Sequence, residues 1–145
     1  MHSLRELLTL QDFFRIPLQT TLSNHYKVTA NINGKNGSFI IDTGASSSCI
    51  DLQHIAHFKL AVKDTHMQAT GAGASNIAMQ VSLNNTLRFG QWSKEKVQII
   101  VMDLSHVNKG LGEIEEAPVH GIIGADLLKM SRTVIDYGRN CMYVK

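Results

Sequence analysis

The feature that most constrains the fold is a pair of β-like segments joined by a two-residue turn. Residues 25–32 alternate between polar and apolar side chains, Asn33-Gly34 follows, and Ser38 to Ile41 continues beyond the turn. Alternation with a period of two is typical of a half-buried strand, and Asn-Gly is a strong signal for a tight turn between antiparallel strands. The sequence therefore predicts a β-hairpin whose second strand ends in an apolar run.

Most of the remaining chain has the same character, with short β-rich runs separated by glycine. We expect strands over residues 66–70, 76–83, 86–89, 97–102, 122–123, 133–137 and 141–144. Glycine-rich residues 71–75 would join the first two of these strands, and Gly90 would form a turn before residues 97–102. Apolar residues at helical spacing predict short helices within residues 1–15, 51–60 and 125–130, whereas residues 104–116 read as a loop or helical turn. The predicted fold class is mainly β.

Length and composition fit one globular domain. The chain has 145 residues, 43% of them hydrophobic, and a formal net charge of +2. The basic residues form no block, so nucleic acid is not an expected partner. No apolar run approaches the roughly 20 residues of a membrane-spanning helix. Charged residues interrupt the N-terminal segment where a signal peptide would be apolar, so we expect no signal peptide in this sequence. The compartment stays open between cytoplasmic and, if a signal was removed, periplasmic or secreted.

The clearest chemical signal lies at residues 39–46, Phe-Ile-Ile-Asp-Thr-Gly-Ala-Ser. Three apolar residues direct Asp42 to the end of a buried strand, where we expect it to be partly desolvated. Thr43 adds a hydroxyl, and Gly44 removes a side chain where a backbone or a substrate must come close. The small side chains of Ala45 and Ser46 keep the place open. From these residues alone, an ordinary turn-forming aspartate is the alternative.

A second segment, residues 119–128, has the sequence Val-His-Gly-Ile-Ile-Gly-Ala-Asp-Leu-Leu. Together the two segments resemble the retropepsin-like aspartic protease family, whose marks are two apolar residues before Asp-Thr/Ser-Gly-Ala and, later, two apolar residues before a glycine that opens a short helix. Gly71-Ala72-Gly73 resembles the tip of the family's flap, and the closing hairpin at residues 133–137 is also similar. The resemblance covers roughly residues 16–145, which leaves residues 1–15 as an N-terminal extension. It implies a closed β-barrel, or acid-protease half, with a flap hairpin and one or two short helices.

The resemblance implies an aspartic endopeptidase. In such enzymes two carboxylates share one proton and activate a water molecule. The chain has one Asp-Thr-Gly sequence, and near Asp136 the bulky Tyr137 stands where a small hydroxyl residue belongs, so we expect Asp136 to be a hairpin residue. The second carboxylate would then come from Asp42 of a second chain across a two-fold axis, which makes the active form a homodimer. No cofactor and no metal are expected.

The family's site residues map onto this chain as follows. Asp42 is the implied catalytic acid and base, Thr43 interlocks the two active-site loops, and Gly44 contacts the substrate backbone. An extended peptide or protein substrate would lie as an added strand between the flap, residues 67–79, and the active-site floor. The expected substrate-binding residues are Ala45, Ser46, Thr70, Gly71, Ala72 and Gly73.

Two further segments matter for the cleft. Ile122, Ile123 and Gly124 are expected to pack beneath the active-site loop as structural support. The chain departs from the viral pattern at Ser46, where an acidic residue is common, and at Ala125, where Arg is common. Because both halves of that ion pair are missing together, we expect a different wall for the substrate cleft.

Three alternative interpretations of the chain stand beside the aspartic endopeptidase. Cys49 near His54 and His57 invites a thiol-nucleophile interpretation, against which stands an ordinary buried cysteine. His54 and His57 could supply two metal ligands, but no acidic or cysteine partners complete a set, so we expect solvated histidines on a helix. Finally, a retropepsin-like domain can serve as a catalytically inactive dimerisation or peptide-binding module.

Overall fold

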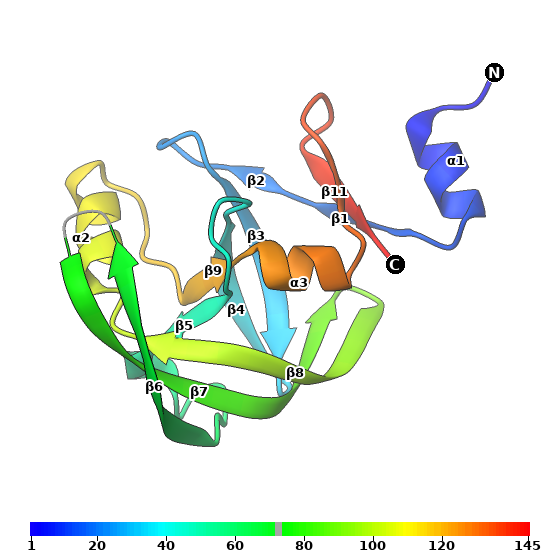
Figure 1. Ribbon diagram of the computed structural model, residues 1–145. Helices are drawn as coiled ribbons and strands as arrows, with labels where there is room; N and C mark the ends of the chain where they lie inside the picture. Colours follow the sequence, from blue (N-terminus) through cyan, green and yellow to red (C-terminus); the bar gives the residue numbers. More distant parts are fainter. Residues whose placement is uncertain (72–73) are drawn as a thin grey trace.

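The structure is a computed structural model that describes the backbone of residues 1–71 and 74–145 and the side chains of residues 1–65 and 79–145 (Figure 1). The helical elements are α1 (Leu4–Leu10), the 3-10 helix η1 (Leu52–His54), α2 (Ser105–Glu113) and α3 (Ala125–Met130). The strands are β1 (Phe14–Pro17), β2 (Gln19–Thr20), β3 (Tyr26–Ile32), β4 (Lys35–Ile41), β5 (Cys49–Asp51), β6 (Val62–Gly71), β7 (Ala74–Phe89), β8 (Trp92–Met102), β9 (Gly121–Ile123), β10 (Val134–Asp136) and β11 (Cys141–Val144). The mainly β fold class is confirmed.

The larger sheet closes into a barrel. Its strand order is β2-β3-β4-β9-β5-β8-β7-β6, and an additional pairing joins β3 to β7. Six strands, β3, β4, β9, β5, β8 and β7, therefore form the closed barrel that the family resemblance implied. Within it, β9 lies between β4, with which it is parallel, and β5, with which it is antiparallel. This arrangement brings residues far apart in sequence to the end of β4.

The first predicted hairpin forms as expected. β3 pairs with β4 over its whole length, and Asn33 and Gly34 both adopt the positive φ values, 53° and 90°, that a tight hairpin turn of this kind requires. β3 keeps the alternating pattern, but β4 ends in three consecutive buried residues. Phe39 and Ile41 face the barrel core, whereas Ile40 packs on the other side in a cluster near α2. Because β4 is covered on both faces there, it reads as an unbroken apolar run.

A separate three-stranded sheet lies beside the barrel, in the order β1-β11-β10. β11 is fully buried and pairs on one side with β1 and on the other with β10, both from the same chain. In Figure 1 this sheet lies on the side of the molecule where both chain ends are found. The two outer strands, β1 and β10, are therefore the edges at which this sheet could be extended.

The structure corrects three of the expected elements. The helix predicted over residues 51–60 is wrong: Asp51 belongs to β5, only η1 is regular, and the chain turns sharply so that Phe58 becomes fully buried. Residues 86–89 are not a separate strand, because β7 continues through irregular pairing between Ser82 and Asn85. Residues 104–116 contain the full helix α2.

The N-terminal segment forms a shorter helix than expected. α1 ends at Leu10, and residues 14–17 form strand β1, which pairs with β11. None of the residues of α1 is buried. Across the described part of the chain, no helix combines the length and apolar character that crossing a bilayer requires.

Candidate active site

Asp42 is the first residue after β4 and opens a loop that leads to β5. Its backbone N–H donates to the carbonyl oxygen of Ile123 (2.9 Å), which continues the pairing of β4 with β9. The N–H of Gly44 donates to Asp42 Oδ1 (2.9 Å), and the N–H of Ala45 donates to the Asp42 carbonyl oxygen (3.2 Å). The turn therefore folds back on the carboxyl group and fixes its orientation.

β9 and the start of α3 support this loop from below. The N–H of Ala125 donates to the carbonyl oxygen of Ala45 (2.7 Å). A Cβ atom on Gly124 would lie only 2.6 Å from that same carbonyl oxygen, so this position admits no side chain. Ile123 and Gly124 thus adjoin the loop as expected, and the glycine is required by close approach of two backbones. Ile122 packs instead against the cluster that contains Cys49 and Leu104.

Two polar residues, the buried Ser48 and the half-buried Asp126, tie the loop to α3 and were missed by sequence reasoning. Ser48 is 2% exposed, and its hydroxyl donates to Asp126 Oδ1 (2.6 Å) while accepting the N–H of Gly124 (2.8 Å). The N–H groups of Ser48 and Leu127 also donate to Asp126 Oδ1. The available signal was an aspartate in the first turn of a helix that follows a glycine, where a carboxylate is favoured.

The first residues of the loop are solvent-exposed in the single chain. Asp42, Thr43, Gly44 and Ser46 are exposed, and Ala45 is half-buried. The expectation that Asp42 is partly desolvated is therefore wrong for one chain alone. The buried part of β4 ends at Ile41, and the carboxyl group extends beyond the barrel edge.

The predicted substrate-binding residues fall into two groups. Residues 42–46 share the loop just described. Thr70 and Gly71 end β6, where Gly71 pairs with Ala74 of β7, and only their backbone is described. Ala72 and Gly73 lie outside the described residues. Among the described residues, β6 pairs with β7 and ends the strand order of the larger sheet.

A cavity of about 470 Å³ opens directly beside Asp42. Ile41, Asp42 and Thr43 contribute one part of its lining, and the rest comes from the β2–β3 segment and the β10–β11 hairpin: Thr20, Asn24, His25, Tyr26, Ile135, Tyr137 and Asn140. Burial raises the pKa of the Tyr26 hydroxyl, and the nearby Tyr137 adds to this effect. Tyr26 is therefore a neutral donor in the physiological pH range, and its hydroxyl donates to Asn140 Oδ1 (2.8 Å).

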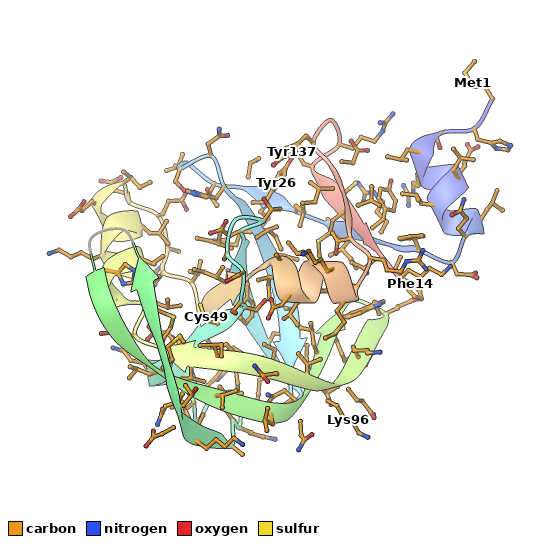
Figure 2. The ribbon with its side chains drawn as sticks, viewed as in Figure 1. Met1, Phe14, Tyr26, Cys49, Lys96 and Tyr137 are labelled. Carbon is orange, nitrogen blue, oxygen red and sulfur yellow. The ribbon has the colours of Figure 1, made fainter. Side chains whose placement is uncertain are left out.

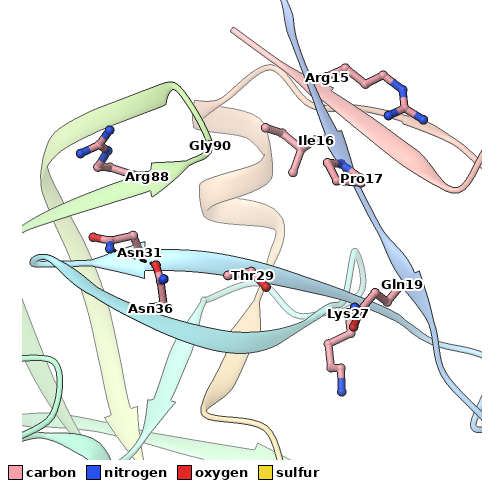
Figure 3. Close-up of a pocket in the computed structure, with 10 residues that line it drawn as sticks. All are labelled: Arg15, Ile16, Pro17, Gln19, Lys27, Thr29, Asn31, Asn36, Arg88 and Gly90. Atoms are coloured by element: carbon pink, nitrogen blue, oxygen red, sulfur yellow. Dashed lines mark hydrogen bonds between the residues drawn. The ribbon is translucent and has the colours of Figure 1, made fainter.

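A second cavity, of about 610 Å³, lies on the outer face of β3 (Figure 3). Its lining includes Arg15, Lys27 and Arg88 but no carboxylate. Figure 3 shows Arg15 and Arg88 on opposite sides, so these cations do not converge on one point. Without an acid or base pair, this cavity is not the candidate catalytic centre.

Asp136 lies at the end of β10 in the last hairpin. Its carbonyl oxygen accepts the N–H of Arg139, and its carboxylate lies 3.6 Å from the Arg139 guanidinium. Asp136 is not among the residues that line the cavity beside Asp42. The prediction that Asp136 is a hairpin residue is confirmed.

The structure argues against the interpretation of Cys49 as a nucleophile. Cys49 is buried in β5, and burial raises its pKa to about 12. A thiol with so high a pKa is protonated at neutral pH and is a poor nucleophile.

Of the two histidines that were expected to be solvated on a helix, His57 is exposed but lies in the turn after η1, and His54 ends η1 and is half-buried. His54 and His57 pack against His120, with ring centroids 4.6 Å and 5.6 Å from it. His120 Nδ1 accepts the backbone N–H of Ser38 (3.0 Å), so neutral His120 carries its proton on Nε2. No cluster of metal-ligand type occurs among the described residues.

A closed six-stranded barrel, with an Asp-Thr-Gly loop seated on a strand-Gly-helix segment, defines the retropepsin-like class of aspartic protease folds. The model of the family described as aspartyl protease matches residues 28–127 of this chain. The chain therefore belongs to the aspartyl protease family.

Solved structures show the same fold. A retropepsin-like aspartic protease from Rickettsia conorii has a TM-score of 0.61 at 18% identity, with 91% of this chain and 90% of that chain covered. EIAV protease complexed with the inhibitor HBY-793 has a TM-score of 0.58 at 19% identity, with 77% and 92% covered. The retroviral protease-like domain of Ddi1 from Leishmania major has a TM-score of 0.57 at 18% identity, with 82% and 86% covered. A search of curated proteins found no match.

Proposed function

We propose that this protein is an aspartic endopeptidase that acts as a homodimer, with a water molecule activated between the Asp42 carboxylates of two copies. The observation that carries the proposal is the Asp42 loop itself. It presents an exposed carboxyl group of fixed orientation on a rigid support, and the chain supplies one such loop.

The chemistry requires two carboxyl groups about 3 Å apart that share one proton. The ionised member accepts a proton from the water as it attacks the peptide carbonyl carbon, and the protonated member donates a hydrogen bond to the carbonyl oxygen. The resulting tetrahedral intermediate collapses when a carboxyl proton passes to the leaving nitrogen, and the C–N bond breaks. Because the two carboxyl groups titrate as a coupled pair, the pH profile reports two apparent pKa values that belong to the dimer and not to either Asp42 alone.

The remaining roles follow from the loop geometry. Thr43 adjoins Asp42 on the face that the second copy must approach, and we assign it to interlocking the two loops. Gly44, Ala45 and Ser46 form the floor on which the substrate backbone would lie. The β6–β7 hairpin, including Thr70, Gly71, Ala72 and Gly73, would close over an extended peptide from the other side.

The deciding experiment compares wild type with Asp42→Asn on a mixed peptide library from acid to neutral pH. Molar mass is measured on the same samples. The proposal predicts a bell-shaped pH profile, a dimeric species, and a loss of at least roughly 100-fold in cleavage rate for Asp42→Asn with dimerisation retained. A folded dimer that cleaves no peptide at any pH would instead favour the inactive binding module.

A further inference from the structure

The cavity beside Asp42 has an exposed aromatic side chain on its far wall. Tyr137 is 75% exposed, although it belongs to the hairpin that joins β10 to the buried strand β11. Figure 2 shows Tyr137 and Tyr26 next to each other at the same end of the molecule. Large apolar side chains exposed at the edge of a cavity are typical of sites where another molecule docks.

Tyr137 rests on a fixed platform. Its ring stacks on that of Tyr26, with centroids 5.3 Å apart and planes inclined by 28°. Tyr26 is itself buried, and its hydroxyl is held by Asn140 Oδ1 and lies 3.4 Å from the Tyr137 carbonyl oxygen. An aromatic side chain that is ordered before binding loses little conformational entropy on association, which is a property of interface anchors.

The proposed reaction requires a second copy of this chain to approach the surface around Asp42. Two Asp42 carboxyl groups can lie about 3 Å apart only if the second copy contacts the surface immediately around Asp42. The cavity that contains Asp42 and Thr43 also contains Ile135 and Tyr137. The second copy therefore meets the β10–β11 hairpin at the same time as it meets the catalytic loop.

Strand pairing favours the same surface. β11 is flanked by two strands of its own chain and cannot accept a third, so the edges left in that sheet are those of β1 and β10. β1 ends in Pro17, which has no N–H to donate, and its residues line the cavity of Figure 3 rather than the one beside Asp42. β10 borders the catalytic cavity through Ile135, and all three of its residues are only partly buried.

Asp136 ends this edge strand. Its side chain is 10% exposed, and its Oδ2 atom has no hydrogen-bond partner in the described part of the chain, although the Arg139 guanidinium lies 3.6 Å away. Because this oxygen is itself buried, a docked molecule does not reach it, and its charge is balanced within the chain by Arg139.

We propose that the β10–β11 hairpin, with Tyr137 as its central anchor, is the surface on which a second copy of this chain docks to complete the catalytic pair. This inference rests on the proposed function and specifies the partner and the contact that assemble its site. Tyr137 acts by holding the dimer together and is not assigned contact with the reacting atoms.

The test measures the dimer dissociation constant by sedimentation equilibrium for wild type, Tyr137→Ala, Tyr137→Phe and Leu83→Ala. Leu83 is the matched control, because it is also a large exposed apolar side chain, at 41%, but lies in β7 away from the cavity lining. Tyr137→Ala is expected to weaken the dimer by roughly 30-fold or more, as for loss of a central aromatic anchor. Tyr137→Phe, which keeps the ring, and Leu83→Ala are expected to remain within a few-fold of wild type.

Circular dichroism and urea unfolding of each monomer establish that the variants are folded. A Tyr137→Ala protein that dimerises with wild-type affinity overturns the inference, and so does a wild-type protein that stays monomeric at every concentration.

A second measurement separates assembly from catalysis. Cleavage by Tyr137→Ala should recover as its concentration is raised, in step with the mass of the dimer, and reach the wild-type rate per dimer. A rate that stays low in a fully dimeric Tyr137→Ala sample contradicts a purely anchoring role. If wild type dimerises but cleaves nothing, the proposed function fails, while the Tyr137→Ala dissociation constant still decides the docking surface.

Discussion

Replacing Ser48 with alanine removes the hydroxyl that links the Asp42 loop to both β9 and α3. This hydroxyl donates to Asp126 Oδ1 at 2.6 Å and accepts the Gly124 N–H at 2.8 Å. Ser48 is 2% exposed, so water cannot readily replace either bond. The substitution therefore loosens the support of the loop without touching Asp42 itself.

The size of the effect follows from these two bonds. A hydrogen bond to a charged acceptor contributes about 1.5–3 kcal/mol, and a buried N–H left without a partner costs about 1–3 kcal/mol. Both hydrogen bonds involve the same Ser48 oxygen atom, so their energies are not additive. We therefore expect a loss of about 3 kcal/mol in the free energy of unfolding. For a domain of this size that corresponds to a fall in Tm of roughly 6–12 °C.

The assay is urea unfolding at one protein concentration, because the stability of a dimer depends on concentration. Ser131→Ala is the matched control: Ser131 is also buried, and the two shortest hydrogen bonds of its hydroxyl are both with neutral groups, the Leu127 carbonyl oxygen (2.8 Å) and the Thr133 hydroxyl (2.8 Å). It should cost only about 1–2 kcal/mol and leave cleavage nearly unchanged. Ser48→Ala should in addition slow cleavage by up to roughly 100-fold, because the loop would shift. Equal losses for the two variants, or a loss under about 1 kcal/mol for Ser48→Ala, would refute the reasoning.

Three further predictions concern other parts of the fold. Gly121→Ala should destabilise the fold by about 3 kcal/mol, because its Cβ would collide with the Cys49 carbonyl oxygen. Gly110→Ala should stabilise by about 1 kcal/mol, because Gly110 lies in helix α2 with open space around it; urea midpoints that move in the same direction contradict this. Burial and the nearby His54 and His57 lower the pKa of His120 from its ordinary 6.5, so the stability it contributes is present above that value and is lost as pH falls through the lowered pKa. His120→Gln should flatten this part of the urea midpoint profile between about pH 8 and 5, and an unchanged slope there would rule out His120 as its source. Finally, Cys49, with its pKa raised to about 12, should resist iodoacetamide at pH 8 in the folded protein and react after unfolding, and rapid native labelling read by mass spectrometry would contradict its burial.

The hairpin of β3 and β4 illustrates what sequence patterns predict well. Alternation and an Asn-Gly turn are local properties, and both act within a few residues. For the same reason, β9 and α3 were recognisable from two isoleucines and a glycine followed by helix-forming residues. The error at residues 51–60 arose because tertiary packing of Phe58 overrides a weak helical spacing.

The candidate site divides in the same way. Asp42, Thr43 and Gly44 stand in a contiguous motif, so the sequence by itself determined which residues form the loop, and with the later Ile-Ile-Gly segment it pointed to the family. Ser48 and Asp126, 78 positions apart, meet only because β9 inserts between β4 and β5. The exposure of Asp42 and the platform under Tyr137 likewise depend on which surfaces the closed barrel leaves uncovered. Local patterns encode turns, strands and motifs because those interactions span a few residues, whereas burial and long-range hydrogen bonds are set by strand order, which only the tertiary structure decides.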